Sequence, residues 1–340
     1  MRYTMMQVCK ETGMTYQALK FYCNEGLVPN VKRDKNNRRV FDERDVAWIS
    51  SLTRLKKCGM SIQEMKDYLA LCLQGERTIP QRKILLAQKA FSNFDLYPLL
   101  APYLAGTEAS GLYESRLGKE ELPDKENHVF CAAFRADEFD ELLCCADHIV
   151  FNSPRQLKKF GPAAKAAGKS VGLRINPECS TQEGHAIYDP CAPGSRLGTT
   201  RAQWDAAAEK DPALLSLLDG LHFHTLCEQD ADALAVTLDA VAEKFGDLLP
   251  KMKWLNFGGG HHITRPGYDM ATLEKCIRRA RNDWGVTVYL EPGEACALNA
   301  GYLLTRVLDV VQNGDTTVAI LDASAACHTP DVIEMPYRPP

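Results

Sequence analysis

Short apolar runs recur eight times between residues 83 and 290, and this repetition constrains the fold of the chain more than any other feature. Segments of helical or loop character separate each run from the next. Alternating strands and crossover helices form parallel sheets. Eight such units within about 200 to 250 residues fit a closed (β/α)8 barrel. The predicted strands are residues 83–87, 106–110, 128–132, 148–151, 171–175, 220–224, 254–257 and 286–290.

Barrel enzymes carry their chemistry at the C-terminal ends of the strands, so the polar residues at those positions indicate the function. An amine can form an imine and an imidazole can stack on a ring. Glycine N–H groups can bind phosphate, and a carboxylate can pair with a ring nitrogen. Together these groups suit a phosphorylated aromatic cofactor. In order of the predicted strands they are Lys89, Arg174, His224 at the end of the sixth strand, the turn Gly258–Gly260, and Glu291.

Five motifs in this region resemble the fold-type III decarboxylases that use pyridoxal phosphate, and most closely the carboxynorspermidine and carboxyspermidine decarboxylases. The resemblance runs from about residue 82 to residue 340 and implies an α/β fold with a barrel of the alanine racemase type. It implies release of CO2 from carboxynorspermidine or carboxyspermidine, which yields norspermidine or spermidine. The motifs are AQKAF at 87–91, GLHFHT at 220–225, NFGGG at 256–260, EPGE at 291–294 and LDAS at 321–324.

The same resemblance assigns roles to the residues at the mouth of the barrel. Lys89 would hold pyridoxal phosphate through an imine, and His224 would stack on its ring. The turn Gly258–Gly260 would bind the phosphate, with Arg174 counted among the cofactor-binding residues. Glu291 would keep the pyridine nitrogen protonated, so that the ring accepts the electrons left by CO2. Lys89, His224 and Glu291 are the predicted catalytic residues.

Two acidic residues are candidates for recognising a cationic polyamine. Related amino-acid decarboxylases usually carry arginine after the EPG motif, whereas this chain has Glu294. Asp322 stands where related enzymes use an aspartate for the distal amine of the substrate. A single acidic residue is more often solvated surface than ligand. For Glu294, Asp322 and Arg174 the two interpretations are evenly balanced.

Other readings of these motifs are weaker. His222 and His224 alternate along a strand and so share a face, and with Cys227 they resemble metal ligands, as do the adjacent His261 and His262. The sequence implies no third ligand for either pair, and we expect no metal site. The glycine turn lacks the GxGxxG spacing of a dinucleotide site.

Charge separates residues 1–80 from the rest of the chain. This segment holds 14 Lys and Arg against nine Asp and Glu, although the whole chain has a net charge of −4. A basic segment followed by an acidic body is typical of a nucleic-acid module joined to another domain, because basic surfaces release counterions from phosphate. We call residues 1–80 the head.

The head has the outline of a winged helix-turn-helix. Residues 4–11 and 15–24 have apolar positions at helical spacing, with Gly13 in the turn between them. Residues 32–41 predict a strand, a basic turn rich in asparagine and a returning strand. Asp42 then begins a third helix. The alternative, a basic helical bundle without a DNA-binding role, is the weaker interpretation.

The head resembles the MerR-type regulators. The motifs are TGMT at 12–15, FY at 21–22, EGLVP at 25–29, RRVF at 38–41 and GMSIQE at 59–64. The resemblance implies that residues of the second helix face the major groove of duplex DNA and that two wing arginines hold the backbone. These DNA-binding candidates are Thr15, Tyr16, Gln17 and Lys20 of the helix and Arg38 and Arg39 of the wing.

The composition of the chain indicates the cellular compartment in which we expect it. The 13 cysteines never form a CxxC spacing, so we expect reduced thiols rather than a disulfide framework or a structural zinc site. No run approaches the roughly 20 apolar residues of a membrane span, and the N-terminus lacks a secretory signal. These observations predict a cytoplasmic protein without a membrane partner.

The two resemblances predict three domains: the head at 1–80, the barrel at 81–308 and the start of a C-terminal β-domain at 309–340. Both families are expected to be incomplete here, since the pairing helix of the regulators, near residues 74–80, and the cysteine loop of the decarboxylase β-domain are not recognisable. We therefore expect impaired turnover. The intact decarboxylase family forms homodimers, and the sequence leaves the oligomeric state of this chain open. The alternative function is a DNA-binding transcriptional regulator whose barrel senses pyridoxal phosphate or a polyamine.

Overall fold

The computed structural model describes residues 3–29, 31–57, 61–63, 65–66, 69, 82–182 and 189–334. The chain forms two compact units, Met1–Leu298 and Asn299–Pro340. Within the described residues, every helix is too short or too polar to cross a membrane. The described cysteines are all free thiols.

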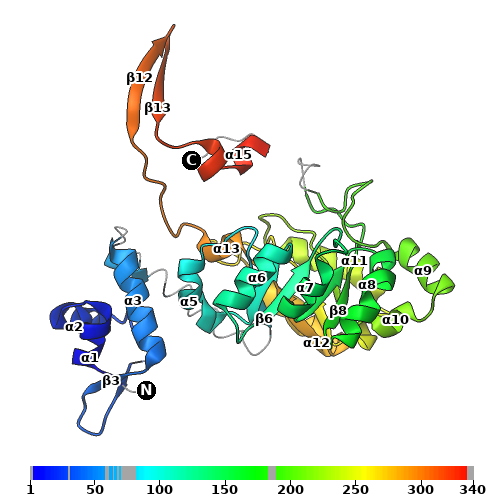
Figure 1. The fold of residues 1–340 in the computed structure, drawn as a ribbon, viewed down its shortest axis with the longest axis horizontal. Helices are drawn as coiled ribbons and strands as arrows, with labels where there is room; N and C mark the ends of the chain where they lie inside the picture. The colour runs from blue at the N-terminus through cyan, green and yellow to red at the C-terminus, as the bar shows by residue number, and fades with distance from the viewer. Residues whose placement is uncertain are drawn as a thin grey trace. The chain divides into compact units, whose positions relative to one another are not determined.

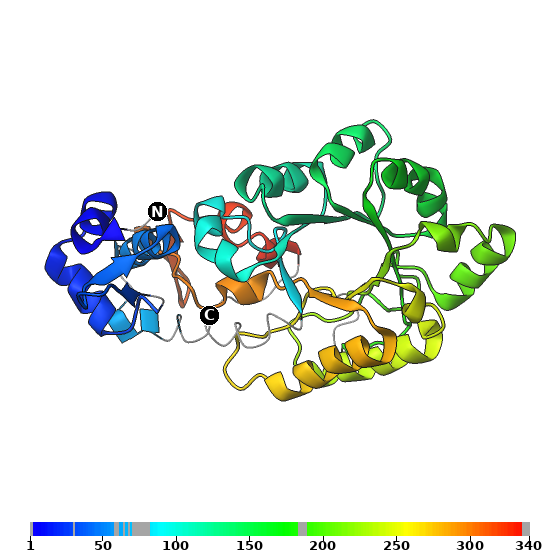
Figure 2. The same cartoon turned by 90° about the horizontal axis from the view of Figure 1, so that it is seen from below.

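The first unit contains a closed barrel of eight parallel strands, as Figure 2 shows from one end. The barrel closes where the last strand pairs with the first, with Tyr289 opposite Lys83. The predicted barrel is therefore confirmed. Its strands are β4 (Lys83–Ala87), β5 (Gly106–Ala109), β6 (Glu126–Phe130), β7 (His148–Phe151), β8 (Ser170–Arg174), β9 (Gly220–His222), β10 (Trp254–Asn256) and β11 (Thr287–Leu290).

Two strands, β6 and β9, differ from the prediction by two residues at one or both ends, and the other six differ by at most one. β6 begins two residues earlier than expected, at Glu126. The carboxylate of Glu126 is paired with the ammonium of Lys83 in β4, so a polar residue is accommodated at the start of the strand. β9 ends at His222, so His224 lies two residues beyond the strand rather than at its end. Both strands are only three to five residues long, and periodicity alone does not place such short boundaries.

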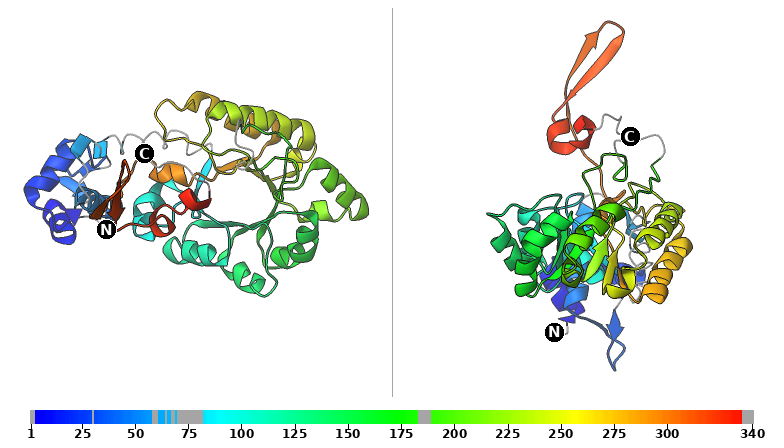
Figure 3. Two further views of the ribbon diagram at one scale, coloured as in Figure 1. Left: turned by 90° about the horizontal axis from the view of Figure 1, so that it is seen from above. Right: turned by 90° about the vertical axis from the view of Figure 1, so that its right-hand side faces the viewer.

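Helices surround the barrel, as the two ends seen in Figures 2 and 3 show. Side-chain caps define where several begin: the hydroxyl of Ser153 accepts from the N–H of Gln156 at 3.3 Å, and Asp269 accepts from the N–H of Thr272 at 3.0 Å. The helices are α5 (Tyr97–Leu100), α6 (Leu112–Glu121), α7 (Phe139–Cys145), α8 (Pro154–Ala166), α9 (Arg201–Lys210), α10 (Leu214–Leu217), α11 (Ala231–Phe245), α12 (Met270–Trp284) and α13 (Glu294–Ala297).

A tryptophan fills the interior at the N-terminal end of the barrel. Trp254 begins β10 and is buried with Leu85, Val150 and Tyr289. A Cβ atom placed on Gly220 would lie 2.0 Å from the indole of Trp254, and one on Gly172 would lie 2.3 Å from it. Glycine is required at these strand positions because the indole occupies the space of a side chain.

The head forms the predicted helices and wing (Figure 1). Gly13 ends the first helix in the left-handed conformation, with φ of 69°, as the TGMT motif predicts. The side chain of Asp42 accepts from the N–H of Asp45 at 3.0 Å and so caps the third helix. The elements are β1 (Tyr3–Thr4), α1 (Met5–Thr12), α2 (Tyr16–Asn24), β2 (Lys32–Arg33), β3 (Arg39–Phe41) and α3 (Glu43–Lys57), with sheet order β1-β3-β2.

The core of the head is apolar and continuous. The indole N–H of Trp48 donates to the carbonyl oxygen of Leu27 at 2.6 Å, which ties α3 to the segment before the wing. The last predicted motif, residues 59–64, lies partly outside the described residues. The predicted approach to a pairing helix, at 74–80, lies wholly outside them. Fully buried core residues include Val8, Leu19, Leu27, Ile49 and Leu52.

The second unit contains an antiparallel hairpin of β12 (Val307–Asn313) and β13 (Thr316–Leu321), with Val310 opposite Ala319. It also holds the short helices α14 (Ala325–His328) and α15 (Asp331–Glu334). The end of the chain, 335–340, lies outside the described residues. The hairpin exposes large apolar side chains of both strands: Val307, Leu308, Val310, Val311, Val318, Ile320 and Leu321.

Candidate active site

Lys89 lies in the turn that follows β4, and hydrogen bonds on both sides fix that turn. The N–H of Ala87 donates to the carbonyl oxygen of Pro292 at 3.2 Å. The buried side chain of Gln88 accepts from the hydroxyl of Tyr97 at 3.0 Å and donates to the backbone carbonyl of Glu114 at 2.9 Å. Lys89 itself is exposed. Its amine is therefore accessible on a rigid support.

The turn Gly258–Gly260 follows β10 and packs directly against the neighbouring strand ends. Gly258 and Gly260 have φ of 71° and 79°, a conformation that favours glycine. A Cβ atom on Gly259 would lie 2.7 Å from the carbonyl oxygen of Glu291 and 3.2 Å from the ring of His224. Among the described residues, the N–H groups of Gly259 and Gly260 have no acceptor. Two free backbone donors beside a histidine ring fit a phosphorylated aromatic group.

His224 lies beside this turn, two residues after β9. Burial lowers the pKa of His224 well below its usual value, and the positive charges of Lys89 and Arg174 lower it further. The imidazole is therefore neutral near pH 7 and is suited to stacking on a ring. The guanidinium of Arg174, at the end of β8, donates to the backbone carbonyl of His224 at 3.0 Å and lies over the ring of Phe130 at 4.5 Å. Burial lowers the pKa of Arg174 to about 10.

Glu291 follows β11 and is buried at 4% exposure. One carboxylate oxygen accepts from the amide of Asn256 at 2.5 Å, and the other lies 3.2 Å from Nε2 of His222. Burial alone would raise its pKa. Its interactions with His222, His128 and Asn256 outweigh this effect, so that the pKa of Glu291 lies below its usual value. Glu291 is therefore ionised and held in a fixed orientation.

Glu108, which lies near the end of β5, is a buried site residue that was not among those predicted from the sequence. Its side chain is 4% exposed, and burial, followed by the nearby carboxylate of Glu291, raises its pKa well above the usual value. The charges of Lys89 and Arg174 act in the opposite direction without offsetting this rise. Glu108 is thus neutral where Glu291 is ionised. A glutamate inside an apolar predicted strand, GTEAS, is the signal that could have identified it.

His222 and Asn256 are two further residues that acquire a role only in the structure. Each ends its strand and binds one oxygen of Glu291. Asn256 also accepts from the N–H of Gly258 at 2.9 Å, so one side chain positions both the carboxylate and the glycine turn. The alternation of His222 with His224 predicts that they share a face, but not which partner His222 has.

Three of the residues that the sequence suggested as metal ligands, His222, His261 and His262, have hydrogen-bond partners within the chain. His222, His224 and Glu291 bring ligand atoms within 4.8 Å of one another, so a third potential ligand is present that the sequence did not imply. One oxygen of Glu291 lies next to His222 and the other accepts from Asn256. His262 lies 3.2 Å from the carboxylate of Glu294.

Glu294 begins α13 and is exposed. Its carboxylate, that of Glu228 and the ring of His262 place their polar atoms within 4.8 Å of one another. Two exposed carboxylates this close favour a cationic ligand. Glu228 was not identified from the sequence, and its left-handed backbone, with φ of 54°, places it in a tight turn after β9.

Asp322 lies in the second unit, directly after β13. Its carboxylate accepts from the hydroxyl of Thr305 at 2.7 Å and from the N–H of Arg306 at 2.8 Å. These hydrogen bonds hold the pKa of Asp322 below its usual value. Within its own unit Asp322 joins the two ends of the hairpin.

In the head, the DNA-binding candidates of α2 lie on its exposed side. Thr15 is the N-cap, and its hydroxyl accepts from the N–H of Ala18 at 3.2 Å. Tyr16, Gln17 and Lys20 are exposed. Positions 16, 17 and 20 follow one another along one helical face, as a recognition helix requires.

The two wing arginines have different surroundings. Arg38 is exposed in the turn between β2 and β3, where the side chain of Asp34 accepts from its N–H at 2.9 Å. The guanidinium of Arg39 donates to the side chain of Asn24 at 2.6 Å, which joins the wing to the end of α2. Arg38 is therefore available for a phosphate, whereas Arg39 also positions the wing.

Comparison with known proteins finds two families in this chain. The sequence model described as MerR HTH family regulatory protein matches residues 3–72. The carboxynorspermidine/carboxyspermidine decarboxylase of Campylobacter jejuni is 43% identical over 255 residues, which are 75% of this chain and 64% of that protein. The carboxyaminopropylagmatine decarboxylase of Synechocystis is 40% identical over 261 residues, 76% of this chain and 65% of that protein.

A solved structure supports the same relationship. The carboxynorspermidine decarboxylase of Campylobacter jejuni, in complex with norspermidine, has a TM-score of 0.69 and 40% identity, and the match covers 80% of this chain and 68% of that one. The chain thus spans slightly less than two thirds of the length of these curated relatives.

Proposed function

The barrel region belongs to the carboxynorspermidine decarboxylase family of fold-type III barrels, and from this premise we propose that it binds pyridoxal phosphate and decarboxylates a carboxylated polyamine. One observation carries the proposal. The accessible amine of Lys89, the neutral ring of His224, the free N–H groups of the glycine turn and the ionised Glu291 all follow C-terminal ends of barrel strands.

Each group of the chain has a separate task at this mouth. Pyridoxal phosphate, when bound, supplies a ring that accepts the electron pair left by CO2. The N–H groups of Gly259 and Gly260 would bind its phosphate, and the amine of Lys89 would link it to the barrel. Glu291 would hold a proton at the ring nitrogen. Its two fixed hydrogen bonds keep the carboxylate oriented without reorganisation.

Of the two buried carboxyl groups at the mouth, Glu291 is ionised and Glu108 is neutral. The neutral carboxyl of Glu108 avoids repulsion with Glu291 while remaining able to donate a hydrogen bond. The guanidinium of Arg174 interacts electrostatically with both Glu291 and Glu108. These charges support a site in which the ionised Glu291 would keep the ring nitrogen of the cofactor protonated.

The exposed carboxylates of Glu294 and Glu228 support a cationic substrate. An aminopropyl or aminobutyl chain carries ammonium groups along a flexible alkyl chain, and each carboxylate can bind one of them. Asp322 remains a proposed ligand for the distal amine. The domain limits 1–80, 81–308 and 309–340 and assembly as a homodimer also remain predictions.

A second function, binding of duplex DNA by the head, is favoured by a specific observation. The family match at 3–72 coincides with a capped α2 whose Tyr16, Gln17 and Lys20 are exposed and with an exposed Arg38 on the wing. The chain would then act as a transcriptional regulator whose barrel binds the cofactor or a polyamine.

Release of CO2 tests the enzymatic proposal. The full chain, purified with pyridoxal phosphate, is assayed with carboxynorspermidine and with carboxyspermidine, alongside Lys89→Ala and the matched surface change Lys210→Ala. We expect release by the parent and by Lys210→Ala and none by Lys89→Ala. Equal release by all three proteins, or a folded parent that binds the cofactor and releases no CO2, contradicts the proposal. The second result would favour the regulator.

A further inference from the structure

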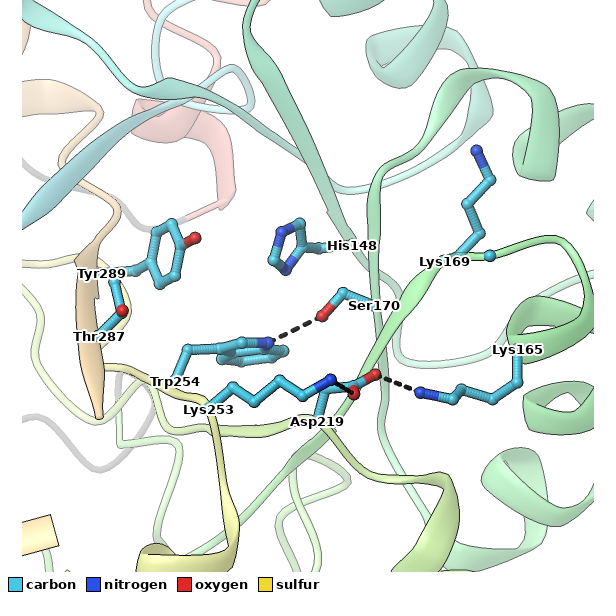
Figure 4. A pocket seen from close by; sticks show the side chains of 10 residues that line it. His148, Lys165, Lys169, Ser170, Asp219, Lys253, Trp254, Thr287 and Tyr289 are labelled. Carbon is cyan, nitrogen blue, oxygen red and sulfur yellow. Dashed lines mark hydrogen bonds and ion pairs between the residues drawn. The ribbon is translucent and has the colours of Figure 1, made fainter. Parts of the chain in front are cut away.

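Two carboxylates at opposite ends of the barrel keep their charge by different means. At the N-terminal end, Asp219 accepts from the ammonium groups of Lys165 at 2.7 Å and Lys253 at 2.8 Å, as the dashed lines in Figure 4 mark. At the mouth, Glu291 is buried, and among the described residues no lysine or arginine forms an ion pair with it. Hydrogen bonds to neutral donors therefore take the place of cations at Glu291.

Asn256 provides one of these donors, and its amide has only one workable orientation. The side chain of Asn256 is fully buried. A backbone N–H can only donate, so the N–H of Gly258, at 2.9 Å, fixes the side on which the amide oxygen of Asn256 lies. The amide nitrogen must then face Glu291, to which it donates at 2.5 Å. Turning the amide over would leave the N–H of Gly258 without an acceptor and would set two oxygens against each other.

A closed ring of hydrogen bonds holds this orientation. The backbone N–H of Glu291 donates to the carbonyl oxygen of Gly258 at 2.8 Å. Gly258 donates to Asn256, Asn256 donates to Glu291, and Glu291 donates back to Gly258. The three bonds together fix the amide nitrogen relative to the carboxylate.

His222, the second donor to Glu291, is adjustable by contrast. Its Nε2 lies 3.2 Å from the other carboxylate oxygen, and its Nδ1 is buried without a hydrogen-bond partner among the described residues. Burial lowers the pKa of His222 below its usual value, so the ring is neutral near pH 7 and its one proton can lie on either nitrogen. A proton on this oxygen of Glu291 can therefore be accommodated by a change of tautomer. The oxygen bound by Asn256 has no such alternative, because an amide nitrogen does not accept.

The other groups around Glu291 act without a hydrogen bond to it. In the part of the chain that the structure describes, only His222 and Asn256 donate to this carboxylate. The carboxyl of Glu108 is neutral, and the guanidinium of Arg174 interacts with both carboxyl groups. The charged and titratable groups that surround Glu291 are His222 of β9, His128 of β6, Glu108 of β5, Arg174 of β8 and His261 after the glycine turn.

We propose that Asn256 is a positioning residue that keeps Glu291 ionised, because its amide, held by the N–H of Gly258, offers the carboxylate only a donor. The residue thereby links the glycine turn, the proposed phosphate site, to the carboxylate that would hold the ring nitrogen. The ionisation of Glu291 is a property of the chain itself. Its effect on CO2 release rests on the proposed function.

Asn256→Asp tests the proposal on the full chain without cofactor. The new carboxyl group still accepts from the N–H of Gly258, but its second oxygen faces Glu291, so the two carboxyl groups must share a proton. The folded chain then holds one proton more than the unfolded chain above about pH 4. This raised pKa stabilises the folded state at low pH only. Relative to the parent, the ratio of folded to unfolded protein should fall about tenfold for each pH unit from about pH 5 to pH 8, as long as the pair keeps its proton.

Denaturant unfolding at a series of pH values measures this ratio. Glu108 also holds a proton in the folded parent, and taking the difference between variant and parent removes its contribution. A merely structural loss of one hydrogen bond would give a difference that does not depend on pH.

The swapped pair Asn256→Asp/Glu291→Gln provides the rescue. The carboxylate and the amide have then exchanged places, so the new carboxylate again faces an N–H donor, and His222 can donate to the new amide oxygen. We expect the pH-dependent loss to disappear. CO2 release should nevertheless stay as low as in Glu291→Gln alone, because the charge is no longer at position 291.

Asn152→Asp is the matched control. Asn152 directly follows β7, accepts from the N–H of Gly198 at 2.7 Å and donates to the carbonyl oxygen of Arg196 at 2.8 Å. It thus makes the same kind of bridge from a glycine N–H, but to a neutral oxygen. Adding Glu291→Gln to Asn152→Asp should not rescue its unfolding at any pH.

Three outcomes overturn the proposal: a loss in Asn256→Asp that does not vary with pH, a pH-dependent loss that the swapped pair retains, or an equal rescue of Asn152→Asp by Glu291→Gln. If Asn256→Asp does not fold in this pH range, a folded swapped pair supports the proposal and an unfolded one overturns it. A parent that releases no CO2 contradicts the proposed function instead, and the unfolding results still decide whether Asn256 keeps Glu291 ionised.

Discussion

The two ends of the barrel use glycine in opposite ways. At the C-terminal mouth, Gly259 and Gly260 bring bare backbone beside His224 and Glu291, and their N–H groups have no acceptor among the described residues. At the N-terminal end, Gly172 and Gly220 make room for the indole of Trp254, which fills the interior. The same residue type therefore leaves free donors at one end and makes room for a packed indole at the other.

The carboxylates follow the same division. Glu291 at the mouth is held by a histidine and an amide, which orient it without a cation in direct contact. Asp219 at the N-terminal end is held by Lys165 and Lys253. A carboxylate that contacts no cation within the chain keeps its charge for a ligand. A carboxylate bound by two ammonium groups instead stabilises the fold. Three predictions test this comparison, and a fourth concerns the head.

The largest effect is expected at Glu291. Glu291→Gln keeps the size of the side chain and removes its charge, so it should lower CO2 release by about 10²- to 10³-fold. The free energy of unfolding should change little, because the amide can still bind Asn256. Steady-state kinetics and denaturant unfolding measure the two quantities. An unchanged rate would show that the ionised carboxylate is not used.

Asp219→Asn should give the reverse pattern, lower stability with little change in CO2 release. Burial raises the pKa of Asp219, but its bonds to Lys165 and Lys253 outweigh burial and hold it below the usual value. Its stabilisation is therefore present above pH 4 and disappears as the pH falls through the lowered pKa. At pH 7 we expect a loss of about 2 kcal/mol in the free energy of unfolding.

Denaturant unfolding at a series of pH values checks this prediction. The difference between the parent and Asp219→Asn should shrink as the pH falls below about 4. A difference that is constant with pH would mean that the charge of Asp219 is not the cause.

A smaller effect is expected at Glu108, although it is buried near Glu291. Because its raised pKa keeps it neutral near pH 7, the amide of Glu108→Gln resembles the native group, and CO2 release should fall by no more than about fivefold. Glu291→Gln is the control, because it makes the same chemical change in the carboxyl group that lies near Glu108 in space. Equal losses in the two variants would contradict the different protonation of the two groups.

The smallest effect is expected in the head. Arg38→Ala should weaken binding to duplex DNA and reduce the slope of log K against log salt by about 1, since one phosphate contact is lost. Lys210→Ala on α9 is the control for overall charge. Fluorescence anisotropy at several salt concentrations provides the slopes. Binding that does not depend on salt would count against a phosphate contact.

The barrel and the head were predictable from sequence because both have strong local signals. Eight apolar runs with polar residues at their ends predict the strands and the mouth, and Gly13 between two amphipathic segments predicts the turn of the head. The boundaries of β6 and β9 were less predictable, since ion pairs and neighbouring strands decide them.

The residues missed at the site are those whose role depends on a partner far away in the sequence. His222 and Asn256 become significant only when the barrel brings them to Glu291, which is 69 and 35 residues away along the chain. The protonation of Glu108 depends on burial and on the charge of Glu291, neither of which a local motif encodes.

The central claim, that Lys89 holds pyridoxal phosphate at the mouth of the barrel, is tested most directly by borohydride reduction of the cofactor-loaded protein followed by peptide mapping by mass spectrometry. We expect a reduced pyridoxyl group on the peptide that contains Lys89, with little label on the other lysines. A label on a different lysine, or folded protein that shows no cofactor absorbance, would contradict it.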